Sequence, residues 1–254
     1  MAPTNFSFNT KTHDFWSIYK TLKKYYPLGL KKIPETSNYF QYEGLRELEK
    51  LIVENFQDKL NYSERWEKKT RKWEAEINYK LVGTTYGQEP SFSAYLEIEK
   101  NKFKNWFFEK QLHFTISLIG PYYTIYGADT CTMVAKENLK LSKLLEQKDR
   151  YYKKVNRIVV SPFAEYEEPF EAIRKLIASD FGNHKFVPYA IYSQGLAGLE
   201  LHYRDEGLNR IYHGLFNNSF DFDASIAGAH VESGDYGFEQ WRINPNDSGI
   251  DESN

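Results

Sequence analysis

The chain has 254 residues with 33 basic and 35 acidic side chains, so its formal net charge is −2. A charge this close to zero argues against a general nucleic-acid-binding protein, because such proteins usually have a strong basic surplus. The single cysteine, Cys131, excludes an internal disulfide and lies in an apolar extended run that predicts a buried, inert thiol. Neither a signal peptide nor a run of roughly 20 apolar residues is visible, so we expect a cytoplasmic protein without membrane contact.

Charge is distributed unevenly along the chain. Residues 136–157 contain eight basic and three acidic side chains, whereas residues 220–254 contain eight acidic side chains and one basic, Arg242. Each segment is explained either as a solvated surface or, for the acidic one, as a surface that meets a basic partner.

The N-terminal part has the apolar spacing of amphipathic helices. Apolar residues recur at i, i+3, i+4 and i+7 over residues 15–26 and 45–56, and Pro27 ends the first of these helices. Ser63 is placed to cap a third, highly charged helix that reaches about residue 71.

The period then changes to two, which is typical of strands. The expected strands cover residues 73–81, 92–98, 103–108, 111–119, 122–126 and 130–135. In the 111–119 strand the even-numbered positions 112–118 are apolar and the odd-numbered ones polar, which predicts a half-buried strand. Short connections favour antiparallel neighbours, so a meander is the economical topology.

The second half of the chain is mixed. Its expected elements are helices over 136–152, 169–181 and 208–216 and strands over 158–160, 186–192, 199–203 and 236–243. The prediction is therefore a single α+β domain over residues 1–243, in which N-terminal helices pack on a mainly antiparallel meander. Any internal division falls near 136–157, and residues 244–254 are expected to be a disordered tail.

No sequence motif points to a particular chemistry. The chain lacks HExxH, CxxC, GxSxG, GxxxxGK[ST] and GxGxxG, and none of its six histidines has a partner at metal-ligand spacing. We therefore expect no catalytic residue, no bound metal and no cofactor.

One acidic, glycine-containing segment is nevertheless a candidate functional site. Five potential ligands lie within fifteen residues of one another: Asp221, Asp223, His230, Glu232 and Asp235. Their spacing matches no calcium loop, so the alternatives are a plain loop, a partner-binding surface and a catalytic or metal site. The partner-binding interpretation assigns Asp221, Asp223, Glu232, Asp235, Tyr236 and Glu239. Aromatic residues make up 17% of the chain, and its 20 tyrosines suit protein recognition.

Several segments carry a family resemblance. The opening FWSIYKTLKKYYPLGL and YFQYEGLRELEKLI, and later HFTISLIGPYYTIYGAD, NRIYHGLF and SGDYGFEQW, occur in this order. Over about residues 14–243 the chain resembles immunity-type proteins of bacterial polymorphic-toxin and contact-antagonism systems, especially those of Bacteroidota. The shared motifs are aromatic and structural, so no binding residue is transferred from them.

The resemblance implies a cytoplasmic protein that binds a cognate secreted toxin and blocks it without catalysis. A basic, nucleic-acid-targeting toxin would fit the acidic segment, which could mimic phosphate. The implied partner is the toxin protein, with no direct contact to nucleic acid or membrane, and the oligomeric state is not predicted. Two alternatives remain: a metal-assisted hydrolase or transferase that uses the acidic segment, and a non-catalytic adaptor.

Overall fold

A computed structural model describes residue 6 and residues 13–33, 38–56, 63–85, 87–141, 144–204, 209–228 and 236–243, and the side chains of these except within 136–148. The fold is α+β, as the sequence predicts: helices pack on both faces of a seven-stranded, mostly antiparallel sheet. None of the helices in the described part of the chain combines the length and apolar composition that crossing a bilayer requires.

The three N-terminal helices form where their apolar spacing predicts them. They are α1 (Trp16–Tyr25), α2 (Glu43–Phe56, after the 3-10 turn η1, Asn38–Gln41) and α3 (Glu64–Ile77). The Ser63 Oγ accepts a hydrogen bond from the Trp66 amide at 3.2 Å, as expected of an N-cap. However, α3 continues to Ile77, so the strand expected over 73–81 is wrong except for its end.

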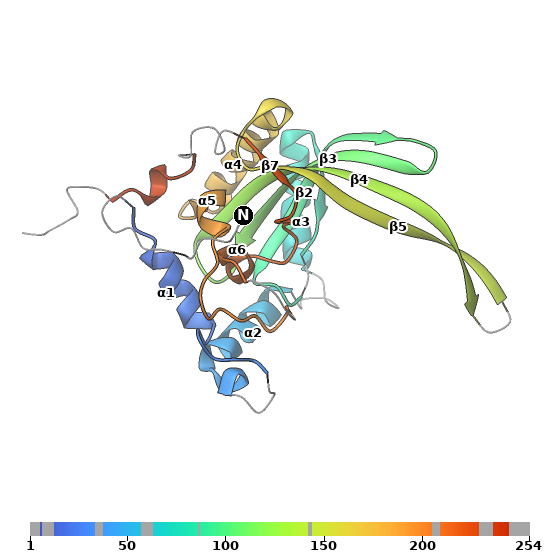
Figure 1. Ribbon diagram of the computed structural model, residues 1–254. Helices are drawn as coiled ribbons and strands as arrows, with labels where there is room; N and C mark the ends of the chain where they lie inside the picture. The colour runs from blue at the N-terminus through green and yellow to red at the C-terminus, as the bar shows by residue number, and fades with distance from the viewer. Residues whose placement is uncertain are drawn as a thin grey trace, which may run out of the picture.

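The sheet is a meander of five strands with two short additions at its edge (Figure 1). The meander comprises β1 (Lys80–Gly83), β2 (Ser91–Lys102), β3 (Trp106–Ser117), β4 (Tyr122–Leu141) and β5 (Leu144–Val159). Adjacent members pair antiparallel, in the order β1-β2-β3-β4-β5. The predicted meander is thus confirmed, with fewer and longer strands.

The helix expected over 136–152 is wrong. Residues 136–141 continue β4 and residues 144–152 form most of β5, and the two strands extend from the body as a hairpin (Figure 1). The region considered for an internal division is therefore part of the same sheet.

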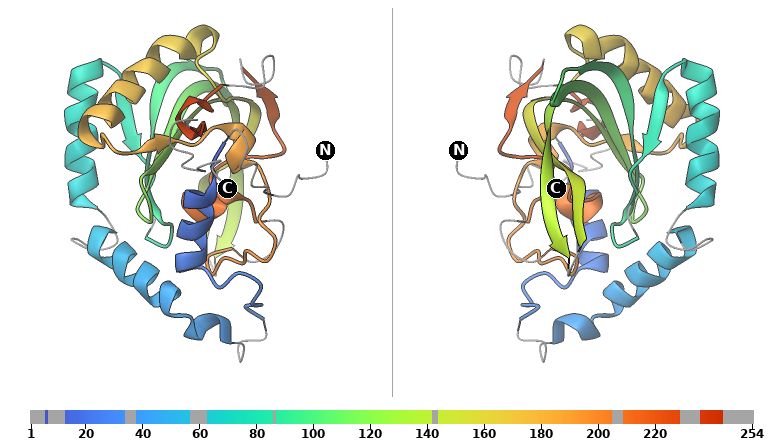
Figure 2. Two further views of the ribbon diagram at one scale, coloured as in Figure 1. Left: turned by 90° about the vertical axis from the view of Figure 1, so that its left-hand side faces the viewer. Right: turned by 90° about the vertical axis from the view of Figure 1, so that its right-hand side faces the viewer.

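The sheet is curved and is covered on both faces (Figure 2). Helices α3 and α4 (Glu167–Asp180) cover one face, where the Trp66 ring stacks on Phe92 at 5.0 Å and Trp73 lies 5.7 Å from Phe114. Helix α1 and the short helices α5 (Tyr189–Tyr192) and α6 (Ile211–Leu215) cover the other.

Burial on both faces corrects the expectation of a half-buried strand for β3. The polar face of β3 is as buried as the apolar one: Gln111 and Thr115 are each only 1% exposed. Tyrosines of β4 share this face, and the hydroxyls of Tyr126 and Ser219 lie 3.4 Å apart. Small hydroxyl side chains and tyrosines therefore allow a second layer to close over this side.

The C-terminal half has less strand than expected. Of the strand expected over 186–192, only Phe186 belongs to a strand, β6 (Lys185–Phe186), and residues 189–192 form α5. The strand expected over 199–203 is replaced by a turn. The strand expected over 236–243 is instead a turn followed by the 3-10 turn η3 (Glu239–Trp241). Strands β6 and β7 (Ser225–Ala227) add to the sheet in parallel, on β4 and β5 respectively. The predicted tail, 244–254, lies outside the described residues.

A buried histidine fixes the start of α6. His213 is 2% exposed, and its Nδ1 accepts a hydrogen bond from the Arg210 amide at 3.0 Å and lies 3.2 Å from the Arg204 guanidinium. Burial, aided by Arg204 and Arg210, lowers the pKa of His213 from 6.5 to about 3. The imidazole is therefore neutral in the folded protein, with Nδ1 as acceptor.

This histidine makes stability depend on pH. Between pH 6.5 and 3 the unfolded chain binds a proton at His213 that the folded chain does not, so the free energy of unfolding falls as pH decreases through this window. By pH 5 the loss should be about 2 kcal/mol. Urea denaturation at several pH values should show a shallower pH dependence for His213→Asn than for the unmodified chain; equal slopes would contradict the assignment.

Candidate functional site: the projecting β-hairpins

The feature most distinct from the body is the pair of hairpins that leave it. We call residues 131–141 and 144–156 of β4 and β5 the arm; the β2–β3 turn lies beside its base. Of the eleven large hydrophobic side chains exposed among the described residues, five lie here, each 41–62% exposed. They are Phe103, Trp106, Met133, Tyr151 and Tyr152.

The β2–β3 turn is an ordered aromatic unit. The rings of Phe103 and Trp106 stack with centroids 4.0 Å apart, and the Phe103 amide donates to the Trp106 carbonyl at 2.8 Å. The Val134 amide donates to the Asn105 carbonyl at 2.7 Å, which attaches the turn to the arm. The exposed rings are therefore held in place rather than loosely displayed.

Pairing register places the apolar side chains on both faces of the arm. Trp106 is opposite Met133, which is opposite Tyr152, so these three side chains share one face. Val134 is opposite Tyr151 on the other face.

A groove of about 840 Å³ runs between the β2–β3 turn and the arm. Its charged lining is Lys100, Lys102 and Lys104 against Asp149 alone, and its apolar lining includes Phe107, where the Lys100 ammonium lies 4.7 Å from the ring centroid. An apolar groove with a basic rim is suited to a partner that offers apolar and acidic groups.

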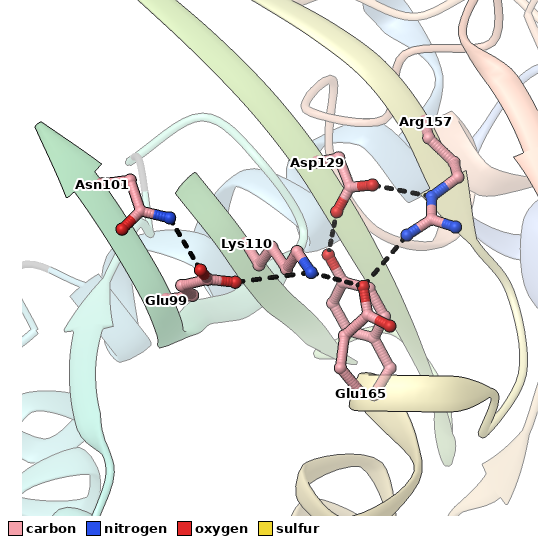
Figure 3. Close-up of polar contacts among 7 residues, drawn as sticks. Glu99, Asn101, Lys110, Asp129, Arg157 and Glu165 are labelled. Carbon is pink, nitrogen blue, oxygen red and sulfur yellow. Dashed lines mark hydrogen bonds and ion pairs between the residues drawn. The ribbon is translucent and has the colours of Figure 1, made fainter. Parts of the chain in front are cut away.

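A row of alternating charges crosses four strands at the base of the arm (Figure 3). Glu99 is opposite Lys110, Lys110 is opposite Asp129, and Asp129 is opposite Arg157. The Asp129 carboxylate accepts from Arg157 Nε and from the Tyr166 hydroxyl, each at 2.6 Å. Lys110 Nζ lies 3.4 Å from the Glu99 carboxylate.

Glu165 ties this row to the helical layer. Its Oε1 lies 2.8 Å from Lys110 Nζ and 3.1 Å from the Arg157 guanidinium (Figure 3). These two cations lower the pKa of Glu165, and the hydrogen bond from Lys110 has the largest effect. Burial, followed by the bond to Asp129, raises the pKa of the Tyr166 phenol, so the phenol stays protonated and donates.

Two β-bulges occur at the level of this row. The register shifts between Glu97 and Glu99 on β2 and between Asp129 and Thr130 on the β4–β5 pair. Bulges bend a strand and increase its twist. They therefore coincide with the point where the sheet passes from core to arm: Leu112, toward the body, is fully buried, whereas Trp106, toward the tip, is exposed.

Cys131, whose burial the sequence predicts, and His113 also lie near this row. Cys131 is half-buried on β4, so the expected burial of its thiol is wrong. His113 is side-chain bonded, with Nε2 3.1 Å from Gln111 Oε1 and its ring stacked on Tyr126 at 5.1 Å. Burial, followed by Lys153, lowers the pKa of His113 to about 3.

The sequence-predicted acidic residues lie elsewhere. Asp221 and Asp223 flank the turn before β7, where the Asp223 amide donates to Asp221 Oδ1 at 2.9 Å and Asp223 is exposed. Glu239 is exposed at the start of η3, and the half-buried Tyr236 ring packs against Phe186 at 5.8 Å.

The remaining members of that set, His230, Glu232 and Asp235, lie outside the described residues. Within the ranges that are described, no three His, Cys, Asp or Glu side chains gather at a spacing that would hold a metal ion. The described acidic residues sit on separate elements, with Asp221 and Asp223 beside β7 and Glu239 on η3.

Sequence reasoning missed the arm because it assigned 136–152 to a helix. The available signals were Tyr151 and Tyr152, which favour strands, and the lack of a capping residue for the proposed helix. Comparison with known proteins adds no assignment: no family model, curated protein or solved structure matches the chain.

The carboxylate at the centre of the charged row should dominate the stability of the arm's base. In Asp129→Asn the amide group presents N–H to one of two donors, Arg157 and Tyr166, so one charge-assisted bond is lost and the other weakened. We expect the free energy of unfolding to fall by about 2–3 kcal/mol, measured by urea denaturation.

Asp223→Asn removes an exposed carboxylate and is the matched control, with an expected change within about 0.5 kcal/mol. Equal losses in the two variants would show that the row does not hold the base of the arm.

Proposed function

We propose that this protein is an immunity-type protein: it binds a cognate secreted toxin in the cytoplasm and neutralises it by direct contact, without catalysis. The observation that carries this proposal is the clustering of exposed aromatic and apolar side chains on the projecting hairpins. Contiguous exposed apolar surface in one place is characteristic of protein-interaction sites.

The composition of the surface supports a protein partner. Aromatic residues, methionine and arginine are enriched at protein interfaces, and this surface offers Trp106, Met133, Tyr152 and Arg150. The Arg150 guanidinium lies 5.6 Å from the Tyr152 ring centroid, a cation–π arrangement that orders both side chains. Ordered anchors lower the entropic cost of binding.

We place the principal contact with the toxin on the arm and treat the acidic residues Asp221 and Asp223 as a second contact surface. Asp223 lies two residues before β7, whose first residue, Ser225, is opposite Arg157 at the base of the arm. A toxin seated on the arm could therefore reach Asp221 and Asp223 with basic groups, in line with the sequence-based partner assignment.

Co-expression tests the function directly. The probe is the protein encoded by the gene immediately upstream, expressed in a host that it kills. We expect host survival when this protein is co-expressed and stable association of the two proteins in a pull-down. Equal killing with and without co-expression would overturn the proposal.

A pair of matched tryptophan variants tests the surface. Trp106 at the β2–β3 turn, beside the base of the arm, and Trp16 on α1 are each 41% exposed. Trp106→Ala should weaken association with the upstream-encoded protein by roughly 2 kcal/mol or more, as for a hot-spot residue, with little loss of fold stability. Trp16→Ala should leave affinity unchanged, and the reverse ranking by calorimetric titration would move the interface away from the arm.

A further inference from the structure

The outer edge of β5 in the arm is an unpaired strand edge. Residues 144–155 of β5 pair with β4, and β7 covers the other edge of β5 only at residues 157–159. Over 144–156, no strand in the described part of the chain adds to this edge (Figure 1). A long open edge is a template for another strand, and natural proteins usually shorten, cover or charge such edges.

Both faces of this part of β5 are also open. Every residue from 149 to 154 is exposed. Tyr151 and Tyr152, which point to opposite faces, are 62% and 47% exposed. A two-stranded ribbon with neither face covered is marginally stable in water, whereas a third strand adds backbone hydrogen bonds and cross-strand contacts. The arm therefore has both the geometry and the energetic need for one more strand.

Charge selects the kind of strand. Residues 148–156 contain Lys148, Arg150, Lys153 and Lys154 against one acidic residue, Asp149. Like charges opposite each other destabilise a pair of strands, so this edge disfavours pairing with a second copy of itself. A partner strand with acidic residues at the same positions would be stabilised by opposite-charge pairs.

The geometry points to strand addition: we propose that the toxin partner contributes an acidic β-strand that pairs with the outer edge of β5 over residues 149–156. This inference rests on the proposed function and names its mode of recognition. Affinity comes from main-chain hydrogen bonds, and specificity from alternate side chains, as in other cases of strand addition.

The register of the arm specifies the partner sequence. Arg150, Tyr152 and Lys154 share one face of β5, because side chains alternate along a strand. The added strand therefore carries an acidic, an apolar and an acidic residue at positions i, i+2 and i+4 opposite them. On the other face, Tyr151 accepts an apolar residue in the same way, whereas the Lys153 ammonium is already bonded to Gln111 Oε1 at 3.2 Å.

Residue-resolved hydrogen–deuterium exchange provides the backbone test. The probe is the protein encoded by the gene immediately upstream, bound to the 254-residue chain. In an antiparallel pair, alternate amides of β5 point to β4 and the others point outward. We expect the outward-pointing amides within 149–156, which exchange fast in the free protein, to be slowed at least about ten-fold in the complex.

A charge-reversed variant provides the side-chain test. Arg150→Glu combined with Lys154→Glu should weaken toxin binding at least about ten-fold at low salt, because both replacements face acidic positions of the added strand. Lys20→Glu combined with Lys23→Glu, which reverses two exposed charges on α1, is the matched control and should leave affinity within about two-fold.

The outcomes separate the two proposals. A complex in which the outward amides of 149–156 exchange as in the free protein overturns strand addition and leaves the immunity function standing. Failure to form any complex overturns both. Protection of the same amides in the free protein, with a dimer in sedimentation, assigns the edge to a second copy and also overturns the inference.

Discussion

The arm depends on the two hydrogen bonds that the Asp129 carboxylate accepts, one from Tyr166 and one from Arg157. Asp129 lies at the point where β4 leaves the core, and its two oxygens are each engaged at 2.6 Å, one by the helical layer and one by β5. Paired in this way, a carboxylate that is only 7% exposed has the desolvation cost of its burial offset by two charge-assisted hydrogen bonds. Lys110 and Glu99 extend the alternation of charge across β3 and β2, so four strands are held at one level.

The charged row separates the buried part of the sheet from the exposed part. Toward the body, Leu112 and Val159 are fully buried, and a Cβ on Gly127 would lie 2.5 Å from the Tyr166 ring, so only glycine lets the ring lie flat on β4. Toward the tip, apolar side chains such as Met133 are exposed. The charged row thus ends the hydrophobic core without ending the strands, and the bulges beside it direct the arm away from the body.

The sequence was sufficient for the fold class and for the elements with a strong period. Helices α1, α2 and α4 and the apolar face of β3 follow directly from their spacing. The sequence was not sufficient where two periods fit the same residues. Trp73 and Ile77 have the spacing of one helix face, yet they also alternate with polar residues as in a strand. They belong to helix α3, because there Trp73 packs on Phe114.

The arm was unpredictable for a different reason. Leu141, Leu144 and Leu145 have helical spacing, and the polar run that follows has no period. Its residues 149–154 are exposed on both faces of the hairpin. The charged row was equally hidden. Glu99, Lys110, Asp129 and Arg157 are separated by 11, 19 and 28 residues, and only the strand register brings them together. Register depends on the hydrophobic pattern of whole strands and on two bulges that no local signal marks.

The β2–β3 turn is already ordered before a partner binds, which lowers the conformational entropy lost on binding. Immobilising rotamer-rich side chains and ordering a loop on contact reduce the free energy that an interface can deliver. Here the Phe103 and Trp106 rings are already stacked, and the turn that carries them is already bonded to β4. The base of the arm is fixed by paired charges, so the Phe103 and Trp106 rings beside it approach a partner in a fixed position. The stability of the charged row and the affinity of the surface are therefore linked: a change that loosens the former lowers the latter without touching a contact residue.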